Sequence, residues 1–259
     1  FIENIFDSYK ESVSIILLGD HLYPMDDIYN NHKNTLAINK NMDRSIYGRV
    51  LTDKKIQKRS LMTHYDFFPT IDRNESKVGK FSYRSGSTDV LAWVLETATG
   101  ETLPELISTY LWKPMGAEFD AYITVDRSGF ALGSRGMNST LRDLSRIGLL
   151  VINKGRAFGE QVIPAKFIED IHNQSGDPYW PYATTENLKP YYRSFWWGVG
   201  NKGRDLNGVG IHGQFLRIAP EADIVIALYS SWPNADGNKK YQYWDKSDNL
   251  LDAIITKFR

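Results

Sequence analysis

Two hydroxyl side chains that could take part in catalysis, Tyr83 and Ser85, stand two residues apart in the chain. A tight turn would let both hydroxyls point the same way, and a segment with helical periodicity follows them. A hydroxyl pair held at the start of a rigid helix has the fixed geometry that acid–base or nucleophilic chemistry requires. The same residues also fit an ordinary capped helix with a surface tyrosine, so this segment alone leaves both interpretations open.

A second group of candidates, His212-Gly213-Gln214, falls in segment 210–218, which has the composition of a β-strand. A histidine beside a glycine in a strand also fits a half-buried residue with structural contacts only. Its place downstream of Tyr83 favours a functional link between the two groups.

Composition disfavours metal-dependent and thiol chemistry. The chain has no cysteine, which excludes disulfides, thiolate catalysis and cysteine-based metal sites. The five histidines follow neither a His-Glu-x-x-His nor a His-x-His spacing, so we expect neither a metal nor another cofactor. These histidines are His21, His32, His64, His172 and His212.

The sequence indicates neither a dinucleotide-binding site nor a known serine-nucleophile motif. Segment 198–203 matches the dinucleotide-binding glycine pattern, but a strand rather than a helix follows it, so we interpret it as a hairpin loop. There is no Gly-x-Ser-x-Gly elbow, and no serine is followed by a lysine three residues later.

Charge and length limit the partners. The 259 residues carry 31 basic and 31 acidic side chains without a long run of either sign, so neither nucleic acid nor an anionic membrane is the expected partner. No apolar run is long enough to span a membrane. The sequence fits a periplasmic or secreted location as well as a cytoplasmic one, and it does not indicate an oligomeric state.

The residues after Ser85 predict a helix that begins at Ser87 or Thr88, either of which can cap it, and that ends at Gly100. A capping box at Thr102 and Glu105 predicts the next helix. Further helices are expected at 43–51, 59–68, 141–151, 165–172 and 245–258. In the predicted helix that follows Ser85, the apolar residues with helical spacing are Val90, Leu91, Val94, Leu95 and Ala98.

The last third of the chain changes to a strand-like period. Segments 195–198, 210–218 and 223–230 predict three strands separated by turns, hence an antiparallel meander. Strands are also expected at 13–18 and, as a pair, at 122–125 and 130–132. Helices that flank an antiparallel sheet form an α+β fold. Residues 1–42 have the weakest patterns, and residues 43–259 are predicted to form one domain.

From about Asp43 onward the chain resembles the serine β-lactamase-like hydrolases, and most of all the class C-related branch of esterases and 6-aminohexanoate-dimer hydrolases. The order and number of matching segments make the resemblance specific. These segments are 79–86, 89–96, 111–116, 138–143 and 210–214. The resemblance implies a β-lactamase/transpeptidase-like fold.

This family places three motifs around one pocket: a Ser-x-x-Lys nucleophile, a Tyr-x-Asn or Tyr-x-Ser base, and a Lys-Thr-Gly-like strand beside the acyl group. The resemblance assigns the second motif to Tyr83 and Ser85 and the third to His212, Gly213 and Gln214. It implies that Tyr83 is the general base and that backbone N–H groups, one of them near Gln214, bind the oxyanion.

The first motif is absent, because none of the serines fits Ser-x-x-Lys. Either the chain is a truncated member whose nucleophile lies upstream, or it is a remnant that binds without reacting. The intact second and third motifs favour a serine hydrolase that cleaves small esters or linear amides through an acyl-enzyme; an inactive binding module is the alternative. A missing N-terminal part would leave a sheet edge or an apolar face bare, unless residues 1–42 fold back over it.

The third motif also predicts substrate preference. His212 stands where the β-lactamases have a lysine, and a histidine is mostly uncharged at neutral pH. Gln214 would narrow the acyl side, and the aromatic residues Tyr192, Trp196 and Trp197 would wall it. We therefore expect weak action on penicillins and cephalosporins, and a preference for substrates without a neighbouring carboxylate.

Overall fold

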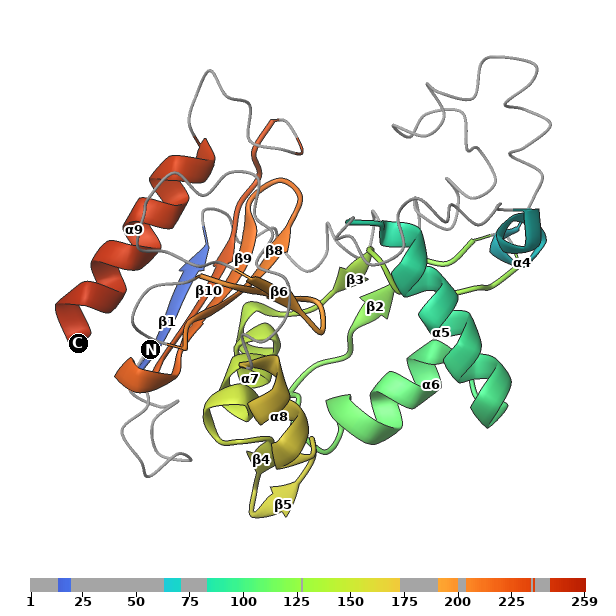
Figure 1. Cartoon of the computed structure of the whole chain (residues 1–259), viewed down its shortest axis with the longest axis horizontal. Helices are drawn as coiled ribbons and strands as arrows, with labels where there is room; N and C mark the ends of the chain where they lie inside the picture. Colours follow the sequence, from blue (N-terminus) through green and yellow to red (C-terminus); the bar gives the residue numbers. More distant parts are fainter. Residues whose placement is uncertain are drawn as a thin grey trace. The chain divides into compact units, whose positions relative to one another are not determined.

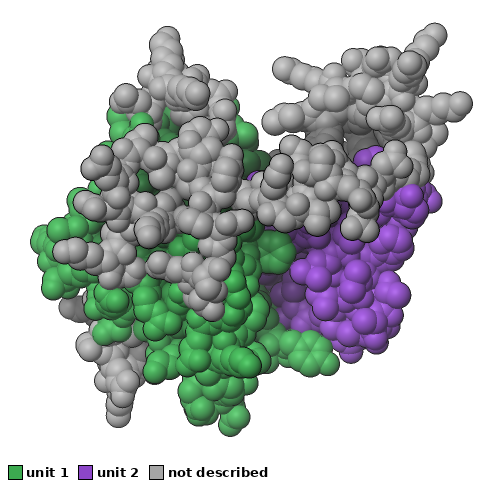
Figure 2. Space-filling view, viewed as in Figure 1, with its two compact units in different colours: residues 1–21, 108–120, 139–259 green, residues 22–107, 121–138 purple. Residues whose placement is uncertain are grey.

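The computed structural model describes residues 14–19 by their backbone and residues 63–70, 83–126, 128–172, 191–199, 204–233, 235 and 243–259 more fully. The predicted helix at 43–51 lies outside these ranges. The chain forms two compact units, which Figure 2 shows in different colours. Unit 1 comprises residues 1–21, 108–120 and 139–259, and unit 2 comprises residues 22–107 and 121–138.

Unit 1 is built on a six-stranded sheet in the order β1-β10-β9-β8-β7-β6 (Figure 1). Strands β6 to β10 form an antiparallel meander, which confirms the predicted arrangement of the last third. The predicted N-terminal strand is also present and adds to the edge as a parallel partner of β10. The strands are β1 (Ser14–Gly19), β6 (Tyr191–Arg193), β7 (Trp196–Gly198), β8 (Leu206–Gly210), β9 (Gln214–Ala219) and β10 (Ile224–Tyr229).

Alternate residues of the central strands serve two separate cores, because successive side chains of a strand point to opposite faces. On β10, Val225 and Ala227 belong to the core under α7 (Leu141–Ile152) and α8 (Ala165–Ile171). Ile224 and Ile226 belong to the core under α9 (Tyr243–Phe258). The sheet is therefore covered by helices on both faces (Figure 1).

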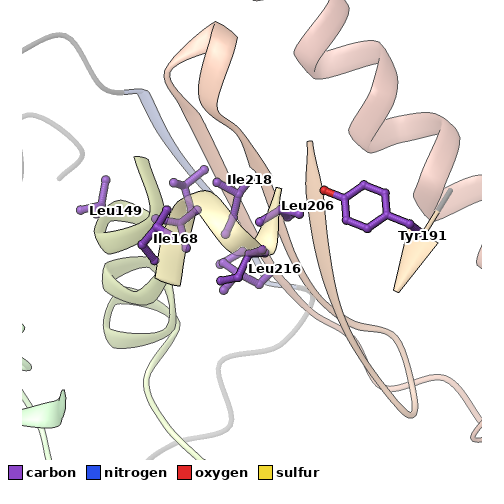
Figure 3. Packing of buried hydrophobic residues seen from close by; sticks show 10 residues of the cluster. Leu149, Ile168, Tyr191, Leu206, Leu216 and Ile218 are labelled. Atoms are coloured by element: carbon purple, nitrogen blue, oxygen red, sulfur yellow. The ribbon is translucent and has the colours of Figure 1, made fainter. Parts of the chain in front are cut away.

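The core under α7 and α8 brings Leu149 and Ile168 from the helices against Leu216 and Ile218 of β9 (Figure 3). Each fully buried aliphatic side chain of this kind contributes roughly 1.5–3 kcal/mol. Gly148 lets α7 approach the sheet closely, since a Cβ there would lie 2.5 Å from Val225 Cγ1. Thr140 caps α7 as predicted.

Helix α9 is held by ion pairs as well as by apolar contacts. Arg217 on β9 is fully buried and pairs with Asp248 and with Asp252, one turn apart on the helix. Arg259 pairs with the buried Asp205 at a distance of 2.7 Å. The apolar periodicity of segment 245–258 predicted the helix, but it carried no sign of these pairs.

Unit 2 contains α4 (His64–Phe67), α5 (Ser85–Thr99), α6 (Leu103–Ile107) and the pair β2 (Tyr122–Ile123) and β3 (Met137–Asn138). Its core gathers around Phe130 and includes Phe68, Ala92, Leu103 and Leu132. The predicted strand pair is only partly right, because β2 pairs with β3 and the expected partners meet only in the single bridge Val125–Ala131.

Helix α5 differs from the prediction at its start. It begins at Ser85 rather than Ser87, with Arg84 as N-cap, and it ends at Gly100 with φ 76° as predicted. Asp89 and Ala92 are its buried residues. The predicted apolar stripe faces outward instead, with exposed fractions of 37% to 55% at Val90, Leu91, Val94 and Leu95.

Several smaller elements of the structure were not predicted from the sequence. The helix predicted from the capping box at Thr102 and Glu105 is present as α6 and is followed by a π-helical turn, η5 (Ser108–Trp112). Strands β6 and β8 and the short hairpin β4 (Arg156–Ala157) and β5 (Glu160–Gln161) were not expected. Among the described residues, no helix is both long and apolar enough to cross a membrane.

Candidate active site

Tyr83 and Ser85 lie at the exposed start of α5. Tyr83 lies two residues before Ser85, the first helical residue, and is 59% exposed; Ser85 is also exposed. Arg84 between them has an extended backbone, with φ −143° and ψ 108°. Residues on either side of an extended residue point to the same side, so this backbone supports the expected common direction of the two side chains.

A buried carboxylate one turn further along fixes this end of the helix. Asp89 is 5% exposed and accepts hydrogen bonds from the backbone N–H and the hydroxyl of Ser134, both at 2.9 Å. The neighbouring Gly133 lies close to the helix, since a Cβ there would be 3.3 Å from Thr88 O. Asp89 was not singled out from the sequence, since an aspartate in a helix is usually solvated.

The third motif differs from the prediction, because His212 and Gly213 do not lie inside a strand. They form the turn between β8 and β9, and the hairpin closes at the Gly210–Gln214 pair. Both residues have left-handed backbones, with φ 61° at His212 and φ 84° at Gly213. A strand cannot contain two such residues in succession, so segment 210–218 must break here. Glycines at 210 and 213 were the available signal for a turn.

Long-range contacts hold this turn. The backbone N–H of His212 donates to Ala235 O at 3.0 Å, and its carbonyl accepts from the Trp232 N–H at 3.1 Å. The ring Nδ1 of His212 lies 2.7 Å from Trp232 O. A Cβ at Gly213 would come within 2.6 Å of Trp232 Nε1, so the indole covers the backbone at this position.

Gln214 opens β9 and is half-buried. Its side-chain amide donates to Ser230 O at 2.6 Å and to His212 O at 3.3 Å. The side chain therefore ties the hairpin turn to the segment that leaves β10. Of the predicted site residues, the structure brings His212, Gly213 and Gln214 together in one hairpin of unit 1, and Tyr83 and Ser85 together in unit 2.

The two tryptophans of β7 point apart, because neighbouring residues of a strand face opposite sides. Trp196 packs against the core under α7 and α8. The ring of Trp197 contacts that of Tyr192, with centroids 4.3 Å apart. A single aromatic wall made of both tryptophans does not fit this geometry, whereas the Tyr192–Trp197 pair does.

A buried carboxylate, whose burial was not predicted from the sequence, makes several contacts at the start of α7. Asp143 is fully buried and accepts from the backbone N–H groups of Glu118 and Phe119 at 2.8 and 3.2 Å. It also pairs with Arg146 at 2.8 Å. Nearby, the hydroxyls of Ser139 and Tyr229 lie 2.9 Å apart, and burial raises the pKa of Tyr229.

Unit 2 has a second cluster of titratable side chains. His64 lies on Asp126, with its backbone N–H and its ring Nδ1 both 2.9 Å from Asp126 Oδ2. Burial favours the neutral acid, but hydrogen bonds from Ser128 and His64 outweigh it and lower the pKa of Asp126 to about 2. Burial and the Glu96 carboxylate raise the pKa of Tyr65 to about 12.

These groups join α4 to the loop before Phe130. The His64 ring stacks on Phe130 with centroids 5.2 Å apart, so the dyad is part of the core of unit 2. Within the described residues, no three His, Asp or Glu side chains are placed to hold a metal ion.

Comparison with known proteins identifies the family. Residues 73–248 match the family model described as Beta-lactamase. A 6-aminohexanoate-dimer hydrolase from Paenarthrobacter ureafaciens is 38% identical over 194 residues, which cover 73% of this chain and 48% of that protein.

Solved structures agree. One from Bacillus anthracis, which carries the name of a 6-aminohexanoate-dimer hydrolase, has a TM-score of 0.60 at 33% identity and covers 73% of this chain and 49% of its own. One from Bacteroides dorei, named as a β-lactamase, has a TM-score of 0.50 at 14% identity and covers 68% and 58%. This second likeness supports the fold alone.

The chain spans about half the length of the curated relative that it matches. Within that span, the order of elements and the antiparallel sheet between helices confirm the expected α+β, β-lactamase/transpeptidase-like fold. The family match covers Tyr83, Ser85 and the residues of the β8–β9 turn. The chain therefore belongs to the serine β-lactamase-like hydrolase family.

Proposed function

We propose that the protein is a serine hydrolase that cleaves small esters or linear amides through an acyl-enzyme, with Tyr83 as general base. The observation that carries the proposal is the exposed Tyr83–Ser85 pair at the start of α5, in a chain that belongs to this family. The relatives that are named after 6-aminohexanoate dimers support an amide as one class of substrate.

In the proposed mechanism these 259 residues supply the base and the oxyanion donor, and the nucleophile lies outside them, since they contain no Ser-x-x-Lys. A lysine ammonium beside the Tyr83 hydroxyl would stabilise the phenolate and let it take a proton from the attacking serine. Ser85 would take part in hydrogen bonding next to the base. A backbone N–H near Gln214 would stabilise the oxyanion of the tetrahedral intermediate.

Substrate preference is proposed from the β8–β9 turn. His212 offers no permanent cation for a substrate carboxylate, unlike the lysine of the β-lactamases proper. The Tyr192–Trp197 ring pair offers aromatic surface for an aliphatic acyl chain. We expect butyrate-type esters and linear amides to react faster than penicillins or cephalosporins. A His212→Lys variant should shift the preference toward substrates with a carboxylate.

The test is the hydrolysis of a p-nitrophenyl ester by a longer form of the protein that carries an upstream Ser-x-x-Lys segment. Tyr83→Phe should lower kcat/KM by about 10²-fold or more, the usual scale for a positioned base. Tyr110→Phe is a matched control, because Tyr110 is 64% exposed and has no proposed role. If Tyr83→Phe retains nearly full activity, Tyr83 is not the base.

The absence of Ser-x-x-Lys favours one other function, a binding module that keeps the pocket without the nucleophile. For the 259-residue chain this alternative predicts ligand binding with no burst of product and no labelling by a fluorophosphonate probe. Labelling at any serine of the chain would exclude it, and would also contradict the absence of the nucleophile.

A further inference from the structure

Trp232 lies beside the β8–β9 turn, although it follows β10 and is 20 residues away from His212 in the chain. Its backbone N–H donates to His212 O at 3.1 Å, and its own carbonyl oxygen lies 2.7 Å from His212 Nδ1. Two residues earlier, Ser230 O accepts from the Gln214 amide at 2.6 Å. Segment 230–232 therefore holds His212 by its backbone and by its ring.

The indole of Trp232 covers the turn at Gly213. A Cβ built on Gly213 would lie 2.4, 2.6 and 2.8 Å from Cε2, Nε1 and Cδ2 of the indole. The hydrogen that glycine carries in that direction therefore points at the five-membered ring. Gly213 also has φ 84°, a backbone conformation that residues with a side chain rarely adopt. Only glycine fits between this ring and this backbone.

The carbonyl of Trp232 also sets the tautomer of His212. A carbonyl oxygen can only accept a hydrogen bond, so a neutral His212 ring carries its hydrogen on Nδ1. The partner of one ring nitrogen commonly decides in this way which nitrogen of a histidine is protonated. Trp232 thus fixes both the orientation of the His212 ring and the place of its hydrogen.

Helix α9 restrains the indole in turn. Tyr243 and Trp244 at the start of α9 contact the Trp232 ring, with centroids 5.9 and 6.5 Å apart. Phe215 of β9 contacts the same ring at 5.8 Å. Trp232 is only 9% exposed in this group, which belongs to the core under α9. Because such a packed core resists small displacements, a shift of α9 would reach the turn through Trp232.

We propose that Trp232 is a positioning residue of the candidate active site, which holds His212 and Gly213 in place and couples them to α9. The inference rests on the proposed function, because it needs the β8–β9 turn to border the acyl group. A small displacement of groups that act on the transition state lowers the rate of the chemical step. Loss of the Trp232 ring should therefore lower kcat more than it raises KM.

The geometry can be tested on the 259-residue chain by NMR at about pH 8, where an ordinary imidazole is neutral. In the unmodified protein we expect one Gly213 Hα far upfield of the other, because it lies against the indole ring, and a hydrogen on Nδ1 of His212. Trp232→Leu should abolish the upfield shift. Tyr243→Leu should reduce it, because the indole loses its stacked neighbour. Two ordinary Gly213 Hα signals, or a hydrogen on Nε2, in the unmodified protein overturn the inference.

The longer form that carries the Ser-x-x-Lys segment tests the effect on the reaction, with p-nitrophenyl butyrate as substrate. Trp232→Leu should lower kcat about ten-fold and change KM less than about two-fold. Trp232→Phe keeps a ring beside Gly213 and should retain at least about a third of kcat. Tyr243→Leu, which leaves the turn and its hydrogen bonds unaltered in sequence, should lower kcat in the same direction and decides the question if Trp232→Leu fails to fold.

The matched control is Leu251→Ala, which removes a fully buried side chain from the same core, about two turns after Tyr243 on α9. It should lower the urea midpoint of unfolding but leave the Gly213 signals and kcat unchanged. Unchanged kcat in Trp232→Leu, or an equal loss of kcat in Leu251→Ala, overturns the inference. If the longer form hydrolyses nothing, the proposed function fails by itself, and the NMR signals of the 259-residue chain decide whether Trp232 positions the turn.

Discussion

The start of α5 and the tip of the β8–β9 hairpin carry the two groups of candidate residues, and they are held in place by different physics. At the helix start, the buried Asp89 collects hydrogen bonds from the loop at Ser134. At the hairpin tip, backbone groups and the side chains of His212 and Gln214 bond to backbone carbonyls, and the indole of Trp232 covers Gly213. No carboxylate takes part in these contacts among the residues that the structure describes. The helix start should therefore be sensitive to the loss of a carboxylate, and the hairpin tip to added volume.

The largest effect is expected from Gly213→Ala in the hairpin. The new Cβ would meet the Trp232 ring and would also sit on a backbone with φ 84°. We expect a loss of about 3 kcal/mol or more in the free energy of unfolding, measured by urea denaturation.

Gly159→Ala separates the two causes. Gly159 has φ 85°, and a Cβ added there would have no other atom within 4 Å, so only the backbone penalty of about 1 kcal/mol applies. Equal losses for the two variants would mean that contact with Trp232 does not constrain the hairpin.

The next effect concerns the helix start. Asp89→Ala removes the acceptor of two hydrogen bonds and leaves the Ser134 N–H without its partner, so we expect a loss of about 2–3 kcal/mol. Ser134→Ala keeps the backbone bond and should lose only about 1 kcal/mol. In the double variant the two losses should not add, because both residues belong to one interaction. Additive losses would show that Asp89 acts through other neighbours.

Sequence patterns identified both regions, but they did not predict the contacts that hold these regions in place. The segments at 83–85 and 212–214 were found from residue types and order, and the helix end at Gly100 and the meander followed from turn chemistry and period. The turn at His212 was missed because its left-handed backbone depends on Trp232 and Ala235, some twenty residues away. Asp89, Asp143 and Arg217 were missed because a charged residue gives no sign in the sequence that it will be buried among distant partners.

The smallest of the three effects is a dependence on pH. The pKa of Asp126 is lowered to about 2, below its unfolded value, so its contribution to stability is complete above about pH 4 and is lost as the pH falls through about 2. Asp126→Asn should cost about 2 kcal/mol at neutral pH and only a small part of this near pH 2, where about half of the Asp126 carboxylate is protonated.

Thermal unfolding of Asp126→Asn and of the unmodified protein, measured at pH values from about 2 to neutral, checks this prediction. Asp170→Asn is the control, because Asp170 is 45% exposed in its pair with Arg193 and should contribute less than about 1 kcal/mol. If the difference between Asp126→Asn and the unmodified protein persists at pH values near 2, the carboxylate is not the source of the stability.

We propose that the family's acyl-enzyme chemistry uses Tyr83 as the base for a serine that lies outside these 259 residues. The most direct measurement is the intact mass of the longer form after rapid mixing with p-nitrophenyl butyrate, followed by peptide mapping. We expect one butyryl group per chain on the serine of an upstream Ser-x-x-Lys, formed much more slowly in Tyr83→Phe. No adduct, or an adduct on any serine numbered here, would contradict it.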